Sequence, residues 1–249
     1  MTLKAHSLPG MASAIVSAAG KQSTFVFAQN GVPWWFFRGT GDEAPLQSVD
    51  PGGVIASSFP AERVLGCIVY PAISLVEPGV VWHSEGNRFS LGELDGARTE
   101  RIRALASALI QAGLKAPVQA RLRQEIWLKL LGNATLNPVS ALTRATLSDF
   151  LSEDRCRDLI HQLMLEVESV GSAYGLHPDI SVERRLEGAA RVGQHRTSML
   201  QDVEAGRPLE VEALVGSVVE MAHRKRVPTP ALEVVYQLTR QLNRSLHPT

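Results

Sequence analysis

Three residues with amine or amide side chains stand in a mainly apolar stretch between residues 126 and 138. Lys129, Asn133 and Asn137 follow one another at intervals of four, while leucine, isoleucine and tryptophan fill most of the other positions. In a helix this spacing places all three on one face over two turns. A lysine buried among apolar groups is costly unless something compensates its charge. An ammonium beside two amides, facing a cleft, can hold an oxyanion or a carboxylate and can donate a proton to a developing alkoxide.

Burial also predicts how Lys129 is protonated. Loss of hydration lowers the pKa of an ammonium from its usual ~10.4 toward the pH at which an enzyme works. The alternative is a lysine that reaches solvent beside two capping asparagines. The spacing alone leaves both interpretations open.

A second polar stretch begins at His195. Arg196 offers a charged fork, and Thr197 and Ser198 offer two hydroxyls, which together suit a carboxylate. Glu210 follows at the start of a predicted helix. Each also has a simpler structural interpretation, Ser198 as a helix N-cap and Glu210 as an acid in the first turn. By themselves these residues do not decide a function.

Taken together, the two stretches resemble the ketopantoate reductases (2-dehydropantoate 2-reductases). The resemblance extends over essentially the whole chain from Lys4 on. It rests on Lys129, Asn133 and Asn137-Pro138, on residues 197–202 followed by Glu210, and on Lys4-Ala5 and residues 29–31.

The resemblance implies roles in substrate chemistry. Lys129 is similar to the family's catalytic lysine, which gives a proton to the substrate's keto oxygen while NADPH delivers hydride to the carbonyl carbon. Asn133 and Asn137 are similar to substrate-binding amides. Residues 195–198, Ser198 most clearly, are similar to the part that holds the substrate's carboxylate and hydroxyl.

The resemblance also implies a cofactor and a reaction. Lys4, Asn30 and Glu210 are similar to positions that contact NADP. The implied reaction is the NADPH-dependent reduction of a 2-oxo acid such as 2-dehydropantoate to pantoate, in pantothenate biosynthesis. Leu147 stands roughly where the family has a further substrate asparagine, and the loss of that amide leaves a different 2-oxo acid as an alternative.

The glycine-rich turn that opens a Rossmann-like nucleotide domain is not found at the start of this sequence. The nearest match, residues 39–44, follows no suitable strand and precedes Pro45, so we expect a loop there. We therefore expect about seventy residues of the nucleotide-binding domain to be missing, on the scale of a βαβ unit and its successor. Two hypotheses follow: a reductase whose gene is truncated or whose start is assigned too late, or a non-catalytic remnant that serves as a binding or dimerisation module.

The elements that would position these residues fall into two regions. Residues 1–118 alternate helix and strand, with a helix from Ser7 to Gly20, strands at 24–28 and 65–70, a hairpin of 79–83 with 88–92, and a helix at 100–112 capped by Thr99. Residues 119–249 are helical almost throughout, in segments 121–136, 147–174, 182–192, 209–224 and 230–246. This pattern predicts an α/β plus all-α fold. The resemblance implies that residues 1–118 are a truncated Rossmann-like NADP-binding domain and residues 119–249 a helical substrate and dimerisation domain.

Composition narrows the class of protein further. The 249 residues include 25 basic and 25 acidic side chains, and a balanced charge argues against nucleic acid as the main partner. Cys67 and Cys156 stand far apart, so neither a disulfide framework nor a metal site is indicated. No apolar run is long enough for a membrane span, and the N-terminus lacks the pattern of a secretory signal. We expect a cytoplasmic protein with a small-molecule partner, and a homodimer stays open.

Overall fold

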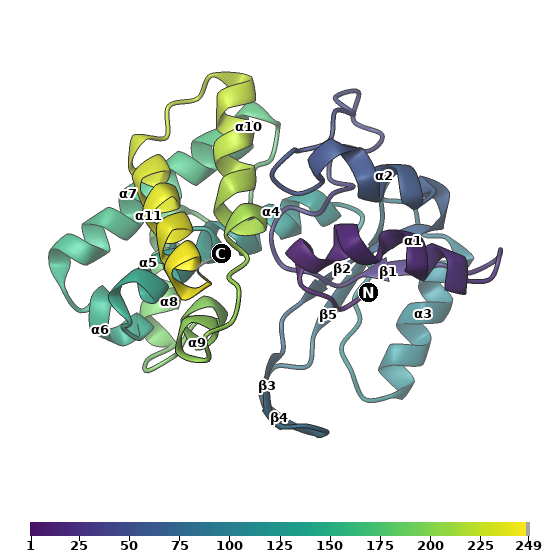
Figure 1. Cartoon of the computed structure of the whole chain (residues 1–249), viewed down its shortest axis with the longest axis horizontal. Coiled ribbons are helices and arrows are strands. Elements are labelled where there is room, and N and C mark those ends of the chain that lie inside the picture. The colour runs from purple at the N-terminus through teal and green to yellow at the C-terminus, as the bar shows by residue number, and fades with distance from the viewer. Residues whose placement is uncertain (248–249) are drawn as a thin grey trace.

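The computed structural model describes residues 1–247, which form two lobes joined side by side (Figure 1). The first lobe holds a small sheet flanked by helices, and the second consists of helices alone. This arrangement is the α/β plus all-α fold that the sequence predicts. Within residues 1–247, no helix combines the length and the apolar composition that crossing a membrane requires.

The first lobe follows the predicted alternation of helix and strand. Its elements are 3₁₀ turns at Ala5–Ser7, Pro51–Gly53 and Ala61–Arg63, helices α1 (Leu8–Ala18), α2 (Val54–Ser58) and α3 (Glu100–Gln111), and strands β1 (Phe25–Phe27), β2 (Val64–Val69), β3 (Ala72–Glu77), β4 (Val80–Glu85) and β5 (Phe89–Glu93). Thr99 caps α3 as predicted, because its side chain accepts a hydrogen bond from the backbone N–H of Ile102.

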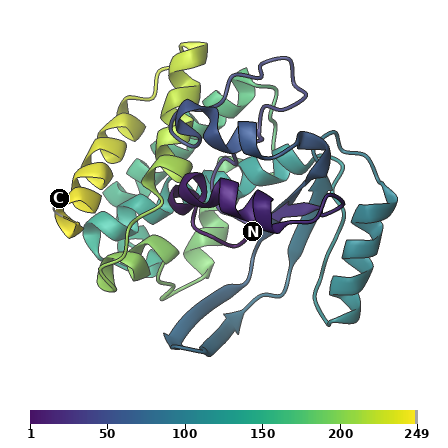
Figure 2. The ribbon, with the colours of Figure 1, turned by 45° about the vertical axis from the view of Figure 1, so that its right-hand side comes forward.

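The main sheet has the order β1-β2-β5. Strand β1 runs parallel to β2, with Phe25 opposite Val64, and β5 runs antiparallel to β2, with Leu91 opposite Cys67. Strands β3 and β4 form a separate two-stranded ribbon, which projects from the body of the molecule (Figure 2).

The predicted hairpin of residues 79–83 with 88–92 is wrong. Strand β4 pairs with β3, a strand that the sequence analysis missed, and β5 pairs with β2 instead. The physical reason is the turn. Pro78-Gly79 joins β3 to β4, and Gly79 has the positive φ that such a tight turn requires after proline.

The second lobe packs around two long helices. Its elements are α4 (Leu122–Asn133), α5 (Leu136–Thr143), α6 (Leu147–Leu151), α7 (Asp154–Ala173), α8 (Val182–Arg191), α9 (Ser198–Glu204), a π-helical turn (Glu212–Gly216), α10 (Ser217–Lys225) and α11 (Pro230–Leu246). Helices α8 and α11 match their predicted ranges closely, whereas three other predicted helices differ.

Each difference has a local cause. The helix predicted at 121–136 ends at Asn133, because Pro138 lacks the N–H that would bond to the carbonyl of Ala134. A new helix, α5, begins at Leu136. The segment predicted at 147–174 divides at Glu153, whose carboxylate caps α7 by accepting from the Cys156 N–H at 2.7 Å. The segment predicted at 209–224 becomes helical only after Glu210.

Buried aromatic side chains join the two lobes. The segment from Trp34 to Phe37 is buried throughout, and Phe36 contacts Trp127 of α4 with ring centroids 6.3 Å apart. Phe37 contacts Tyr174, just after α7, at 5.2 Å. Burial of this much apolar surface fixes α4 against the first lobe. The boundary near residue 118 stays a prediction.

Candidate functional site

A cavity of about 590 Å³ lies where the ribbon and the end of β2 meet the helical lobe. Side chains from both lobes line it, including Asn30, Tyr70, Lys129, Asn133, Asn137, Leu147, Arg185 and Ser198. No aspartate or glutamate is among the lining residues, whereas lysine and arginine are. The cavity is therefore suited to an anion rather than to a cation.

Lys129 enters this cavity from α4 and does not extend into bulk solvent. Its Nζ donates a hydrogen bond to Oδ1 of Asn30 at 2.7 Å and another to the backbone carbonyl of Val69. The ring of Tyr70 lies 5.3 Å from Nζ, close enough for a cation–π contact. All three partners belong to the first lobe, so the ammonium connects the two lobes.

The protonation of Lys129 reflects this environment. Burial lowers the pKa of Lys129 to about 8, and the charge of Arg185 also acts to lower it. The carboxylate of Glu210 acts in the opposite direction. Near neutral pH the side chain is thus mostly protonated yet can give up its proton far more readily than an exposed lysine.

Asn133 and Asn137 line the same cavity but do not stand on one helix, contrary to the prediction. Asn133 is the last residue of α4, and Asn137 lies in the first turn of α5. The break caused by Pro138 turns the chain between them, yet both amides still face Lys129's cavity. Asn137 is 7% exposed, so its amide competes little with bulk water for a ligand.

Ser198 also lines the cavity, at the start of α9. It is not the N-cap of that helix, as one interpretation had it. Thr197 is the cap, with its hydroxyl accepting from the N–H of Leu200 at 3.2 Å, and this leaves the Ser198 hydroxyl free to bind a ligand. Arg196 forms an ion pair with Glu204, so its guanidinium is already compensated.

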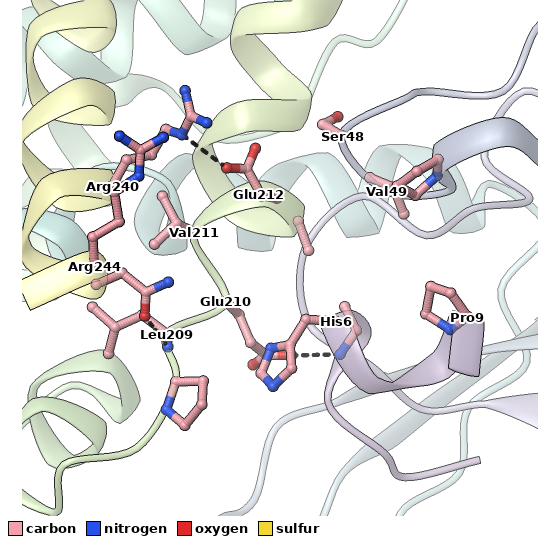
Figure 3. Close-up of a pocket in the computed structure, with 15 residues that line it drawn as sticks. His6, Pro9, Ser48, Val49, Leu209, Glu210, Val211, Glu212, Arg240 and Arg244 are labelled. Atoms are coloured by element: carbon pink, nitrogen blue, oxygen red, sulfur yellow. Dashed lines mark hydrogen bonds and ion pairs between the residues drawn. The ribbon is translucent and has the colours of Figure 1, made fainter. Parts of the chain in front are cut away.

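The three residues proposed for the cofactor occupy different surroundings. Asn30 lines the Lys129 cavity. Glu210 lies in a second cavity of about 430 Å³ between the start of α1 and α11, where Ala5 donates its N–H to the carboxylate at 3.0 Å beside His6 (Figure 3). Lys4 is ion-paired with Asp202. Glu210 precedes the helix instead of opening it, because residues 207–210 are not helical.

Two of these three residues carry groups that could bind part of a nicotinamide cofactor. Asn30 and Glu210 offer an amide and a carboxylate that suit the hydroxyls of a ribose. Within residues 1–247, the glycine pair at Gly39 and Gly41 lies in an open loop that leads into no helix, so it forms no cradle for a pyrophosphate. The same part of the chain contains no cluster of side chains that could hold a metal ion.

Sequence reasoning missed Arg185 and Tyr70 in the cavity wall. A signal for Arg185 was present, since it stands three residues after Val182 and four before Ala189, both of which are buried on the inner face of α8. An arginine at such a position points toward the core rather than to solvent. Tyr70 follows a strand end, and nothing in its spacing marks it.

Comparisons with known proteins agree with this geometry. A family model described as "Ketopantoate reductase PanE/ApbA C terminal" matches residues 121–243. A 2-dehydropantoate 2-reductase of Mesorhizobium japonicum is 45% identical over 97% of this chain and 75% of that protein.

Solved structures give the same result for the fold. A crystal structure described as a ketopantoate reductase from Ralstonia solanacearum superposes with a TM-score of 0.92 at 37% identity, covering 98% of this chain and 75% of the other. D-mandelate dehydrogenase with NADH and anilino(oxo)acetate superposes with a TM-score of 0.82 at 20% identity over 98% of this chain and 75% of that chain, which shows a shared fold.

Proposed function

The chain belongs to the ketopantoate reductase family, and we propose that it reduces the keto group of a 2-oxo acid such as 2-dehydropantoate, with NADPH as reductant and Lys129 as proton donor. The observation that carries this proposal is the placement of the Lys129 ammonium. It is partly buried between the lobes, hydrogen-bonded to Asn30, and faces a cavity with the amides of Asn133 and Asn137.

The chain's own residues account for the charge that develops during the reaction. Reduced nicotinamide supplies a hydride to the carbonyl carbon when it is bound. As the C=O bond becomes a single bond, its oxygen takes a proton from Nζ of Lys129, and the products are a 2-hydroxy acid and neutral lysine. The ammonium stabilises the negative oxygen before the proton moves.

Asn30, Asn133 and Asn137 position the reacting groups. Asn30 accepts a hydrogen bond from Nζ and so directs the ammonium within the cavity. The amides of Asn133 and Asn137 offer N–H donors and C=O acceptors to the hydroxyl and carbonyl groups of a substrate. Such orientation contributes to rate because it removes the entropy cost of aligning the reactants in the transition state.

Leu147 favours a second candidate within the same reaction class, a reductase for a different 2-oxo acid. Its side chain is 5% exposed and lines the cavity. It therefore presents an apolar surface that offers no hydrogen bond to a polar group of the substrate. A comparison of kcat/KM for 2-dehydropantoate with values for other branched 2-oxo acids tests this candidate. A ranking with 2-dehydropantoate last would support the change of substrate.

The direct test is NADPH oxidation by the purified chain with 2-dehydropantoate, for the wild type and for Lys129→Ala. We expect the variant to lose a factor of about 10²–10⁴ in kcat, while Lys21→Ala at an exposed lysine serves as the control. An unchanged rate in Lys129→Ala would remove this residue from the mechanism. Titration with NADPH in the absence of substrate separates an enzyme from a non-catalytic binding module, because the module would show no binding in the micromolar range usual for enzymes.

A further inference from the structure

Arg185 is a cation in the cavity wall that lacks a partner within residues 1–247. It extends from α8 into the cavity that holds Lys129. Its Nε is shielded from solvent and has no hydrogen-bond acceptor, and the side chain forms no ion pair with the described residues. A half-buried guanidinium without an acceptor is costly, so the arrangement calls for an anion from outside the chain.

The nearby acid does not supply that anion. Glu125 receives hydrogen bonds from Tyr70 at 2.9 Å and Ser90 at 2.7 Å, and it is ion-paired with Arg88. All of these contacts are made by Oε1 of Glu125, which does not line the cavity and forms no hydrogen bond or ion pair with Arg185 within residues 1–247. The other arginine of the cavity, Arg196, is compensated by Glu204. Arg185 thus differs from Arg196 in the same cavity by having nothing to bind.

Gly132 makes room for the Arg185 guanidinium beside Lys129. A Cβ at position 132 would lie 2.6 Å from an Nη atom of Arg185, closer than real contacts allow. Gly132 stands three residues after Lys129 on α4, so the two positions share one helix face. The burial of Arg185 lowers its own pKa, and its charge also acts to lower that of Lys129, as expected for two cations facing one space.

Resting on the proposed function, we propose that Arg185 binds the carboxylate of the 2-oxo acid, next to the carbonyl that Lys129 protonates. In a 2-oxo acid the carboxylate is bonded directly to the keto carbon, so its cation must lie beside the proton donor. The planar fork of a guanidinium matches the two carboxylate oxygens with parallel hydrogen bonds. Ser198 then contributes a neutral hydroxyl rather than the charge.

The proposal makes Arg185 a determinant of specificity for acids over neutral ketones. The test compares binding of 2-dehydropantoate with binding of its neutral carboxamide by calorimetry, without turnover. We expect the wild type to prefer the acid by about 10- to 100-fold, the range for a hydrogen bond to a charged group. Arg185→Gln should abolish most of that preference, and Arg185→Lys should keep part of it because the charge remains without the fork.

Arg184→Gln is the matched control, since it removes an exposed arginine from the same helix, outside the cavity lining, and should leave the preference unchanged. Thermal unfolding of each variant verifies that it folds. If Arg185→Gln does not fold, the comparison is made with Arg185→Lys. Equal binding of acid and carboxamide by the wild type, or a full preference in a folded Arg185 variant, would overturn the assignment. A wild type that binds the acid selectively but never oxidises NADPH would overturn the proposed function and leave Arg185 as the carboxylate site.

Discussion

Replacement of Lys129 by methionine tests whether the ammonium is truly held out of water. Methionine has nearly the same length and no charge, so it removes the cost of burying the cation. The pKa of Lys129 falls from 10.5 to about 8 on folding, which corresponds to about 3 kcal/mol of lost stability near pH 7. The variant also loses the hydrogen bonds to Asn30 and Val69, roughly 1 kcal/mol each. The net expectation at pH 7 is a variant more stable than the wild type by about 1 kcal/mol.

The sign of this difference should reverse with pH. Between pH 8 and 10.5 the unfolded chain carries the Lys129 proton and the folded chain does not, so this group makes the wild type more stable as pH rises. At pH 10 most of the burial cost is gone while the two hydrogen bonds remain, and the variant should be less stable by about 1 kcal/mol.

Urea unfolding of the two proteins at pH 7, 8, 9 and 10 measures this difference, and NADPH oxidation is recorded in parallel. Wild-type kcat should fall as pH rises through about 8, since only the protonated ammonium donates a proton. Lys21→Met at an exposed lysine controls for the loss of one positive charge. A Lys129→Met variant that is less stable than the wild type by the same amount at every pH would refute the argument, because it would mean that Lys129 is not desolvated.

Two further predictions concern packing and thiol reactivity. Gly171→Ala should lower the free energy of unfolding by about 1–3 kcal/mol in urea titrations, because the added Cβ would lie 2.0 Å from Nε1 of Trp127. Gly188→Ala is the control, since a Cβ there meets nothing within 4 Å, and it should stabilise the chain slightly. Equal effects of the two substitutions would contradict the contact between Gly171 and Trp127. Burial raises the pKa of the Cys67 thiol to about 11, so iodoacetamide should modify the more accessible Cys156 first. Mass spectrometry of the folded chain measures the order of alkylation. Alkylation of Cys67 before Cys156 would argue against the burial of Cys67.

Local signals in the sequence were sufficient for the elements that begin and end with clear caps. Helix α3 follows the Thr99 cap, and α11 begins at Pro230 as predicted. The position of Lys129 at a cavity was also predictable, because a cation in an apolar helix is conspicuous whatever its partners. These features depend on residues within one or two turns of each other.

Features that depend on distant partners were not predictable. Strand β3 has mostly exposed apolar side chains, so it lacks the alternation that marks a half-buried strand. One acceptor for Lys129 is Asn30, which is 99 residues away in the sequence. The role proposed for Arg185 depends on which residue of α4 faces α8, and only the folded chain reveals that Gly132 stands there.

The cavity has two walls of different stiffness, one formed by the β3–β4 ribbon and the other by helices. Ile73, Ser74 and Ser84 of the ribbon line one side, yet within residues 1–247 its two strands pair only with each other, and Leu75 and Trp82 are 68% and 64% exposed. Two-stranded ribbons of this kind are marginally stable on their own, so bending this wall costs little, whereas the opposite wall belongs to tightly packed helices. A bulky substituent directed toward the ribbon should therefore be accommodated, while one directed toward the helices should be rejected.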